Sequence, residues 1–181
     1  MKATGIVRRI DELGRIVIPK EIRRTYKIRE GTPLEIFSGE NGELMLKKFS
    51  PVLELEDIAV DSCKSIFDTL EYDIFVCDKD EVIAVEGSVN FKKSFLHKSI
   101  TLDLERVIEN RKPLLLNSKE GANLVQLIKE REISYSSLVI VPILASGDTY
   151  GAIVLVGQNN FSNQDVKTLQ TFANFISLQI G

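Results

Sequence analysis

A proline at position 19 is the feature that most limits how the start of this chain can fold. Residues 15–18 read RIVI, and β-branched residues favour a strand. Pro19 has no amide hydrogen for a central strand, but it suits the first position of a helix. Ile22 and Tyr26 then lie four residues apart, which places them on one face of a helix. We therefore expect a strand, a break at Pro19 and a helix over residues 20–26.

The remainder of the first fifty residues reads as short strands. Residues 5–10 predict a strand, and residues 11–14 a turn. Residues 34–37 and 43–49 alternate apolar and polar positions around the hairpin signal GENGE. So small a fold buries too little apolar surface to be stable alone. It contains no cysteine, and the one histidine of the chain is His97, so disulfides and zinc are excluded as supports. We infer an obligate dimer whose strands complete each other's sheets.

The dipeptide Ser50-Pro51 predicts a domain boundary, because proline ends the preceding strand. We expect a first domain over residues 1–50, a linker over 51–53 and a second domain over 54–181. The second domain predicts two long helices bracketing an antiparallel sheet, an α+β fold of α/β/α layers. Its predicted helices cover 52–70, 99–110 and the residues after Ser162, with Asp165 completing a cap; its predicted strands cover 74–77, 82–85, 114–116, 138–144 and 150–156.

Charge divides unevenly between the two halves. Residues 1–50 carry 11 Lys and Arg against 7 Asp and Glu, a net +4. Residues 51–181 carry 12 against 19, a net −7, and together these give the formal charge of −3. Six of the nine arginines lie within the first 29 residues. Because arginine makes bidentate contacts to phosphate and guanine, the clustering indicates a polyanion-binding module on an otherwise acidic protein.

The N-terminal segment TGIVRRIDELGRIVIPKEIRRTYKI, followed by LEIF and ELMLKKFSP, resembles the AbrB-type transition-state regulators of spore-forming bacteria. The resemblance runs from Met1 to Pro51. It implies a swapped-hairpin β-barrel built by an interlocked dimer. It also implies a transcription regulator that binds double-stranded DNA and both activates and represses sporulation genes. Such a protein is expected in the cytoplasm, associated with the nucleoid.

The resemblance also implies which residues contact DNA. No helix-turn-helix is predicted, so strands, turns and helix ends must make the contacts, and these lean on phosphates. We expect the protein to recognise DNA shape and deformability more than a strict base code. Asp11 and Glu12 orient the neighbouring cations, deter loose binding or are ordinary turn carboxylates, and these interpretations remain open. The basic positions that match the family are Arg8, Arg15, Arg23 and Arg24, with Arg9 and Lys2 as secondary candidates.

The second half resembles a GAF domain, a small-molecule-sensing α+β fold. The segment ILASGDTYGAIVLVG and the helices on either side of the sheet carry the resemblance. It implies a ligand pocket near residues 91–99 and 117–136, although the asparagine-lysine-aspartate motif of cyclic-nucleotide GAF domains is absent. Two alternatives remain open. The pocket binds an unknown small molecule, or side chains fill it and the domain only oligomerises, giving a tetramer.

Other chemistry finds little support in the sequence. There is no nucleophile elbow, P-loop, dinucleotide-binding or H-E-x-x-H motif, so no catalytic residue, cofactor or metal site is predicted. A lone His97 does not make a zinc site of the usual type. Cys63 and Cys77 are expected to be small buried hydrophobes. No signal peptide or membrane segment is predicted. The alternative functions are an antitoxin-like repressor of the same barrel class and a sensor with no DNA role.

Overall fold

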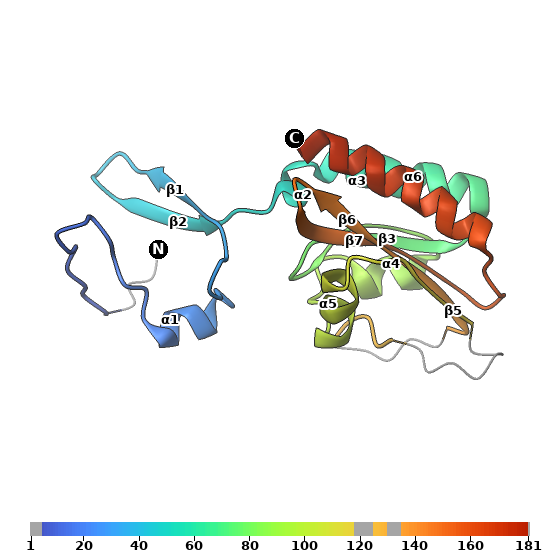
Figure 1. Ribbon diagram of the computed structural model, residues 1–181, viewed down its shortest axis with the longest axis horizontal. Helices are drawn as coiled ribbons and strands as arrows, with labels where there is room; N and C mark the ends of the chain where they lie inside the picture. Colours follow the sequence, from blue (N-terminus) through green and yellow to red (C-terminus); the bar gives the residue numbers. More distant parts are fainter. Residues whose placement is uncertain (1–4, 118–124, 130–134, 181) are drawn as a thin grey trace. The chain divides into compact units, whose positions relative to one another are not determined.

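A computed structural model describes residues 5–117, 125–129 and 135–180 of the chain. The chain forms two compact units, Met1–Phe49 and Ser50–Gly181, and each is described here by itself. Both combine helices with antiparallel sheets (Figure 1), so the predicted α+β class is confirmed.

The first unit contains one helix and one hairpin. Helix α1 covers Lys20–Thr25 and begins directly after Pro19, as predicted. Strands β1, Leu34–Ser38, and β2, Leu44–Lys48, pair antiparallel, which confirms the predicted hairpin. Gly42, at φ +73°, lies in the turn between them, where a side chain would be strained.

The two strands expected before Pro19 are absent, and that prediction was wrong for the single chain. Residues 5–18 contain a turn but no strand. Val7 is 86% exposed, Leu13 74% and Val17 71%, so nothing in the described part of the unit covers these three side chains. A strand needs a neighbour to pair its backbone amides and carbonyls, and residues 19–49 of this unit supply none to residues 5–18.

The first unit lacks a core of its own. Among residues 5–49, none is buried. On the hairpin, Ile36 lies opposite Leu46, and Leu44 lies two positions along the same face. These three side chains are 66%, 47% and 67% exposed, respectively. An uncovered apolar sheet face is unusual in a monomeric protein. The unit's other exposed apolar residues are Ile6, Val7, Ile10, Leu13, Ile16, Val17, Tyr26, Met45 and Phe49.

The second unit is built on a five-stranded antiparallel sheet of order β4-β3-β7-β6-β5. Its long central pair, β6 and β7, is joined by a tight turn at Ser146 and Gly147, both at positive φ. The strands are β3 (Asp73–Cys77), β4 (Val82–Glu86), β5 (Leu114–Asn117), β6 (Ser137–Ala145) and β7 (Asp148–Gly157).

Helices cover both faces of this sheet (Figure 1). Helices α3 (Glu56–Leu70) and α6 (Asn163–Ile180) lie on one face, with Val139 and Val141 in the core beneath them. Helices α4 (Val89–Phe95) and α5 (Leu102–Glu109) lie on the other, over Leu138 and Ile140. Because alternate residues of a strand point to opposite faces, β6 supplies both cores.

The helix expected over residues 52–70 is two helices. Helix α2 covers Pro51–Glu54, Leu55 is not helical, and α3 begins at Glu56. The residues expected to form a linker, 51–53, therefore lie in α2. Val52 is fully buried in the core beneath α3 and α6, so apolar burial holds this short helix on the second unit.

Helix α4 was not predicted, although its signals are in the sequence. Ser88 accepts from the Phe91 amide and caps the helix, and Phe91 and Phe95 share its buried face. Helix α5 begins three residues later than expected because the Thr101 hydroxyl accepts from the Leu104 amide as its cap.

The expected cap of the last helix is confirmed. The Ser162 amide donates to Asp165 Oδ2 at 2.7 Å, and the Gln164 amide donates to Ser162 Oγ at 3.2 Å. These bonds satisfy amides that the first turn of α6 leaves unpaired.

Candidate nucleic-acid interface

A tight turn from Asp11 to Arg15 presents the first basic side chain. The Gly14 amide donates to the Asp11 carbonyl at 3.0 Å, and Gly14 has φ +75°, which only glycine adopts without strain. Asp11 Oδ1 accepts from the amides of Leu13 at 3.0 Å and Arg15 at 2.8 Å. Asp11 Oδ2 accepts from Arg15 Nε at 2.8 Å. One carboxylate therefore closes the turn and orients the guanidinium.

This geometry shows Asp11 in both roles, closing the turn through Oδ1 and orienting the Arg15 side chain through Oδ2. Hydrogen bonds from the Arg15 amide and then from its side chain lower the pKa of Asp11 below its ordinary value of 3.8. The Arg15 side chain stays 69% exposed although its Nε is bound. An Nε contact leaves the terminal nitrogens of a guanidinium available to an outside acceptor.

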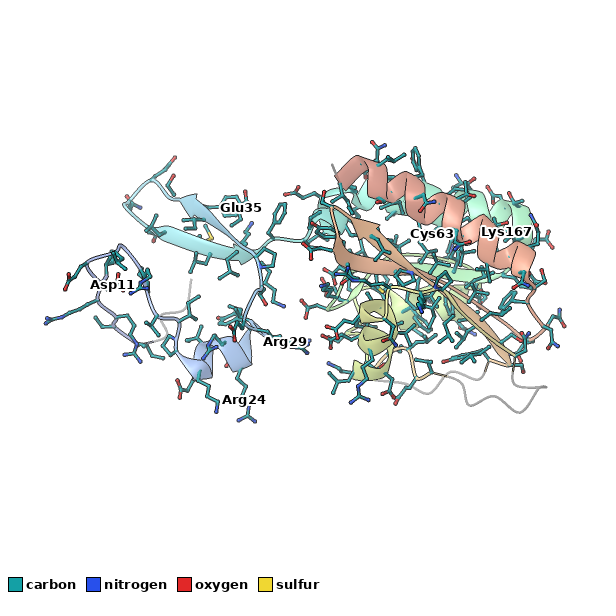
Figure 2. The ribbon with its side chains drawn as sticks, viewed as in Figure 1. Asp11, Arg24, Arg29, Glu35, Cys63 and Lys167 are labelled. Carbon is teal, nitrogen blue, oxygen red and sulfur yellow. The ribbon has the colours of Figure 1, made fainter. Side chains whose placement is uncertain are left out.

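Helix α1 presents two further cations. Arg23 and Arg24 occupy its last turn and are both exposed. Arg24 projects from α1 on the side away from β1 and β2 (Figure 2). Ile22 is half-buried, and on the helical wheel Arg24 lies about 200° from it and Arg23 about 100°.

The remaining candidate DNA contacts are Arg8, Arg9 and Lys2. Arg8 and Arg9 are exposed, and Arg8 Nη1 donates to the Val7 carbonyl at 3.2 Å. Lys2 lies outside the described residues. On the hairpin, Lys47 Nζ lies 5.0 Å from the centre of the Phe37 ring, a cation–π contact that engages this cation within the unit.

The expected ligand pocket of the second unit contains aromatic side chains. Phe75 of β3 and Phe91 and Phe95 of α4 are all buried between the sheet and the helix. The rings of Phe91 and Phe95 stack at 4.2 Å between centroids, and Phe75 lies 5.1 Å from Phe95. Part of the predicted segment 117–136 lies outside the described residues.

Both cysteines are buried, as predicted. Burial raises the pKa of Cys63 to about 12 and raises that of Cys77 as well, so neither is a ready thiolate. His97 is exposed. Within the part of the chain that the structure describes, no three His, Cys, Asp or Glu side chains converge as metal ligands, and no helix has the length and apolarity to cross a bilayer.

Comparisons with known sequences match the whole chain. Residues 54–181 match the family described as stage V sporulation protein T C-terminal, transcription factor. Residues 7–52 match the family described as antidote-toxin recognition MazE, bacterial antitoxin. The chain is 46% identical over 181 residues to stage V sporulation protein T of Bacillus subtilis (strain 168), covering 99% of each. It is 55% identical over 51 residues to the transition state regulatory protein AbrB of the same organism, covering 28% of this chain and 52% of that one.

Solved structures confirm the fold of the second unit. The GAF domain of an Acinetobacter phosphoenolpyruvate-protein phosphotransferase aligns with a TM-score of 0.56 at 20% identity, over 74% of this chain and 84% of that one. A methyl-accepting chemotaxis protein fragment aligns with a TM-score of 0.59 at 16% identity, over 71% and 89%. Identities this low establish the fold alone. The family match over residues 54–181 and the 46% identity over 181 residues show that the chain belongs to the stage V sporulation protein T family of transcription factors.

Proposed function

We propose that the chain is a DNA-binding transcription regulator of sporulation genes, acting as activator and repressor. The observation that carries this proposal is the set of exposed arginines on a small basic unit: Arg15 oriented by Asp11, and Arg23 and Arg24 at the end of α1. The similarity to stage V sporulation protein T and to AbrB supports the same function. We propose Arg8, Arg15, Arg23 and Arg24 as the main DNA contacts, with Arg9 and Lys2 as secondary ones.

The basic unit acts as an interlocked dimer in this proposal. Two observations support it: no described residue of the unit is buried, and the apolar hairpin face with Ile36, Leu44 and Leu46 is uncovered. Segment 5–18 also has apolar side chains and no strand partner. A second copy could supply both the cover and the missing pairing in a swapped-hairpin barrel. Each arginine would then occur twice on one basic surface.

The second unit further assembles these dimers in our proposal. Phe175 is 49% exposed and Leu178 78% exposed on α6, and Val60 is 46% exposed on α3. Exposed apolar residues on both helices of one layer support helix pairing between copies, giving a tetramer that sets the spacing of two basic dimers. The buried phenylalanines favour an oligomerisation role over a preformed ligand pocket. A ligand would affect DNA affinity only by binding one arrangement more tightly than the other.

The same proposal includes a division into two domains, a cellular location and the lack of a catalytic role. We propose that residues 1–50 bind DNA and that the GAF-like part, 54–181, senses or assembles. A regulator of this kind would act in the cytoplasm on the nucleoid and without catalysis. An antitoxin-like repressor is the second candidate, favoured by the match of residues 7–52 to the MazE family. It predicts a stable complex with a toxin protein.

Salt dependence of DNA binding tests the proposal. Each phosphate contact contributes about 0.9 to the slope of log affinity against log salt. We expect Arg24→Ala to reduce the slope by about 1 for each copy that contacts phosphate. Lys112→Ala, at an exposed cation of the second unit, is the matched control and should leave the slope unchanged. An unchanged slope in Arg24→Ala would remove this residue from the interface, and no binding by the unaltered chain would refute the proposal.

A further inference from the structure

Ser50 is the first residue of the second unit, and its hydroxyl makes two hydrogen bonds. Oγ donates to Asp78 Oδ2 at 2.9 Å, and it accepts from the Leu53 amide at 3.4 Å as the cap of α2. Its carbonyl accepts from the amides of Leu53 at 3.0 Å and Glu54 at 3.2 Å. The entry point of the chain is thus attached to the turn between β3 and β4.

The other oxygen of Asp78 holds that turn closed. Oδ1 accepts from the amides of Asp80 at 2.6 Å and Glu81 at 2.8 Å, and the Asp78 amide donates to the Glu81 carbonyl at 3.0 Å. A carboxylate bound on both oxygens has little freedom to rotate. A movement of the turn therefore moves the acceptor that holds Ser50.

The far side of the turn is joined to the segment that follows α4. The Ile100 amide donates to the Asp80 carbonyl at 3.0 Å. The Val82 amide donates to the Lys98 carbonyl at 2.9 Å, and the His97 amide donates to the Val82 carbonyl at 3.0 Å. Three backbone bonds thus connect residues 97–100 to the turn and to the start of β4.

Residues 97–100 are placed in turn by α4. Phe91 and Phe95 hold this helix against Phe75 of β3, and the chain leaves the helix through Leu96 and His97. The Lys98 amide donates to the Phe95 carbonyl at 3.0 Å, so a molecule or partner that displaces α4 from the sheet would pull on residues 97–100.

We propose that the β3–β4 turn, residues 78–81, relays the position of residues 97–100 to Ser50, and so to the segment that leads into the basic unit. The regulatory consequence rests on the proposed DNA-binding function, whereas the mechanical link does not. The relay gives the GAF-like unit a hydrogen-bonded route by which a change near α4 alters how the chain is held at its entry point.

The link is tested by straining the backbone at His97 and measuring amide hydrogen exchange in α2. His97 has φ +58°, a conformation that β-branched residues disfavour, so His97→Val should strain residues 97–100. Amide hydrogen exchange of the full chain measures local opening. We expect the protection of the Leu53 and Glu54 amides to fall about threefold or more. His97→Gly relieves the strain and should leave their protection at or above that of the unaltered chain.

Arg111→Val is the matched control. Arg111 has φ +59° and bonds to Ile108 at the end of α5, apart from the turn, so the same substitution should not change exchange at Leu53 or Glu54. If Arg111→Val has the same effect as His97→Val, or if His97→Val has none, the relay is wrong.

Substitutions at Ser50 show whether the hydroxyl carries the effect. Ser50→Asp retains an acceptor for the Leu53 amide but loses the donor to Asp78, so His97→Val should have no added effect in that background. Ser50→Thr keeps the hydroxyl and should preserve the effect. An undiminished effect of His97→Val in Ser50→Asp overturns the route through Asp78.

DNA affinity of the same variants separates the two proposals. We expect His97→Val to change the dissociation constant for DNA in the unaltered background and not in Ser50→Asp. Equal affinity of all variants would overturn the regulatory consequence. Failure of the unaltered chain to bind DNA would refute the proposed function, while the exchange results would still decide the mechanical link.

Discussion

Replacing Ile36 by alanine tests whether the uncovered hairpin face is a dimer interface. The substitution removes three carbon atoms, worth about 2.4 kcal/mol when fully buried, at about 0.8 kcal/mol each. Ile36 is 66% exposed in the single chain. About two thirds of that energy, roughly 1.6 kcal/mol per copy, would therefore be gained only when two copies pair.

A symmetric dimer contains the substitution twice, so the loss is about 3 kcal/mol per dimer. That corresponds to an increase of about 200-fold in the dimer dissociation constant. Sedimentation equilibrium on residues 1–53 measures this constant without association through the second unit. Glu40→Ala, in the exposed turn of the same hairpin, should leave it unchanged. A dissociation constant for Ile36→Ala within about threefold of the original would show that this face does not pair.

Three further predictions test other parts of the structure. The pKa of Asp11 is lowered, so its carboxylate stabilises the turn at pH above 3.8, and this contribution is lost as pH falls through the lowered pKa. NMR titration should find the pKa of Asp11 below 3.8. A higher pKa would contradict the Arg15 contacts. Gly151→Ala would place a Cβ 1.9 Å from the Cys77 carbonyl oxygen, and should lower the unfolding free energy by about 3 kcal/mol or more in thermal melts. Gly147→Ala, which meets no atom within 4 Å, should cost less. Leu178→Glu, at a side chain 78% exposed on α6, should halve the mass of the full-chain assembly by light scattering, and an unchanged mass would exclude that surface from assembly.

Local signals predicted most of the second unit. The apolar runs of β6 and β7 and the cap at Ser162 and Asp165 are properties of short segments, and the structure has them where the sequence indicated. The break at Leu55 has no such signal. It follows from Val52 entering the core, a tertiary contact that a periodic pattern over residues 52–70 does not show. Helix α4 is only seven residues long, so its two buried phenylalanines were too few for a recognisable period.

In the first unit, the structure has the elements that depend on local sequence and lacks those that need a partner strand. The hairpin and α1 were predicted because a turn signal and Pro19 act locally. The strands over 5–10 and 15–18 were predicted from their β-branched residues, and the single chain provides no partner for them. Of the candidate interface, the sequence identified the arginines, but it left the role of Asp11 open. The hydrogen bonds of Asp11 with the Arg15 amide and with Arg15 Nε depend on the geometry of the turn.

The central claim is that residues 1–50 bind DNA as a dimer, and the mass of a protein–DNA complex tests it most directly. Light scattering on residues 1–53, alone and with a short labelled duplex, gives both the state of the free fragment and the number of copies bound. We predict a folded dimer that binds as two copies and dissociates as salt rises. A folded monomer, or a folded dimer that does not bind the duplex at low salt, would contradict the claim.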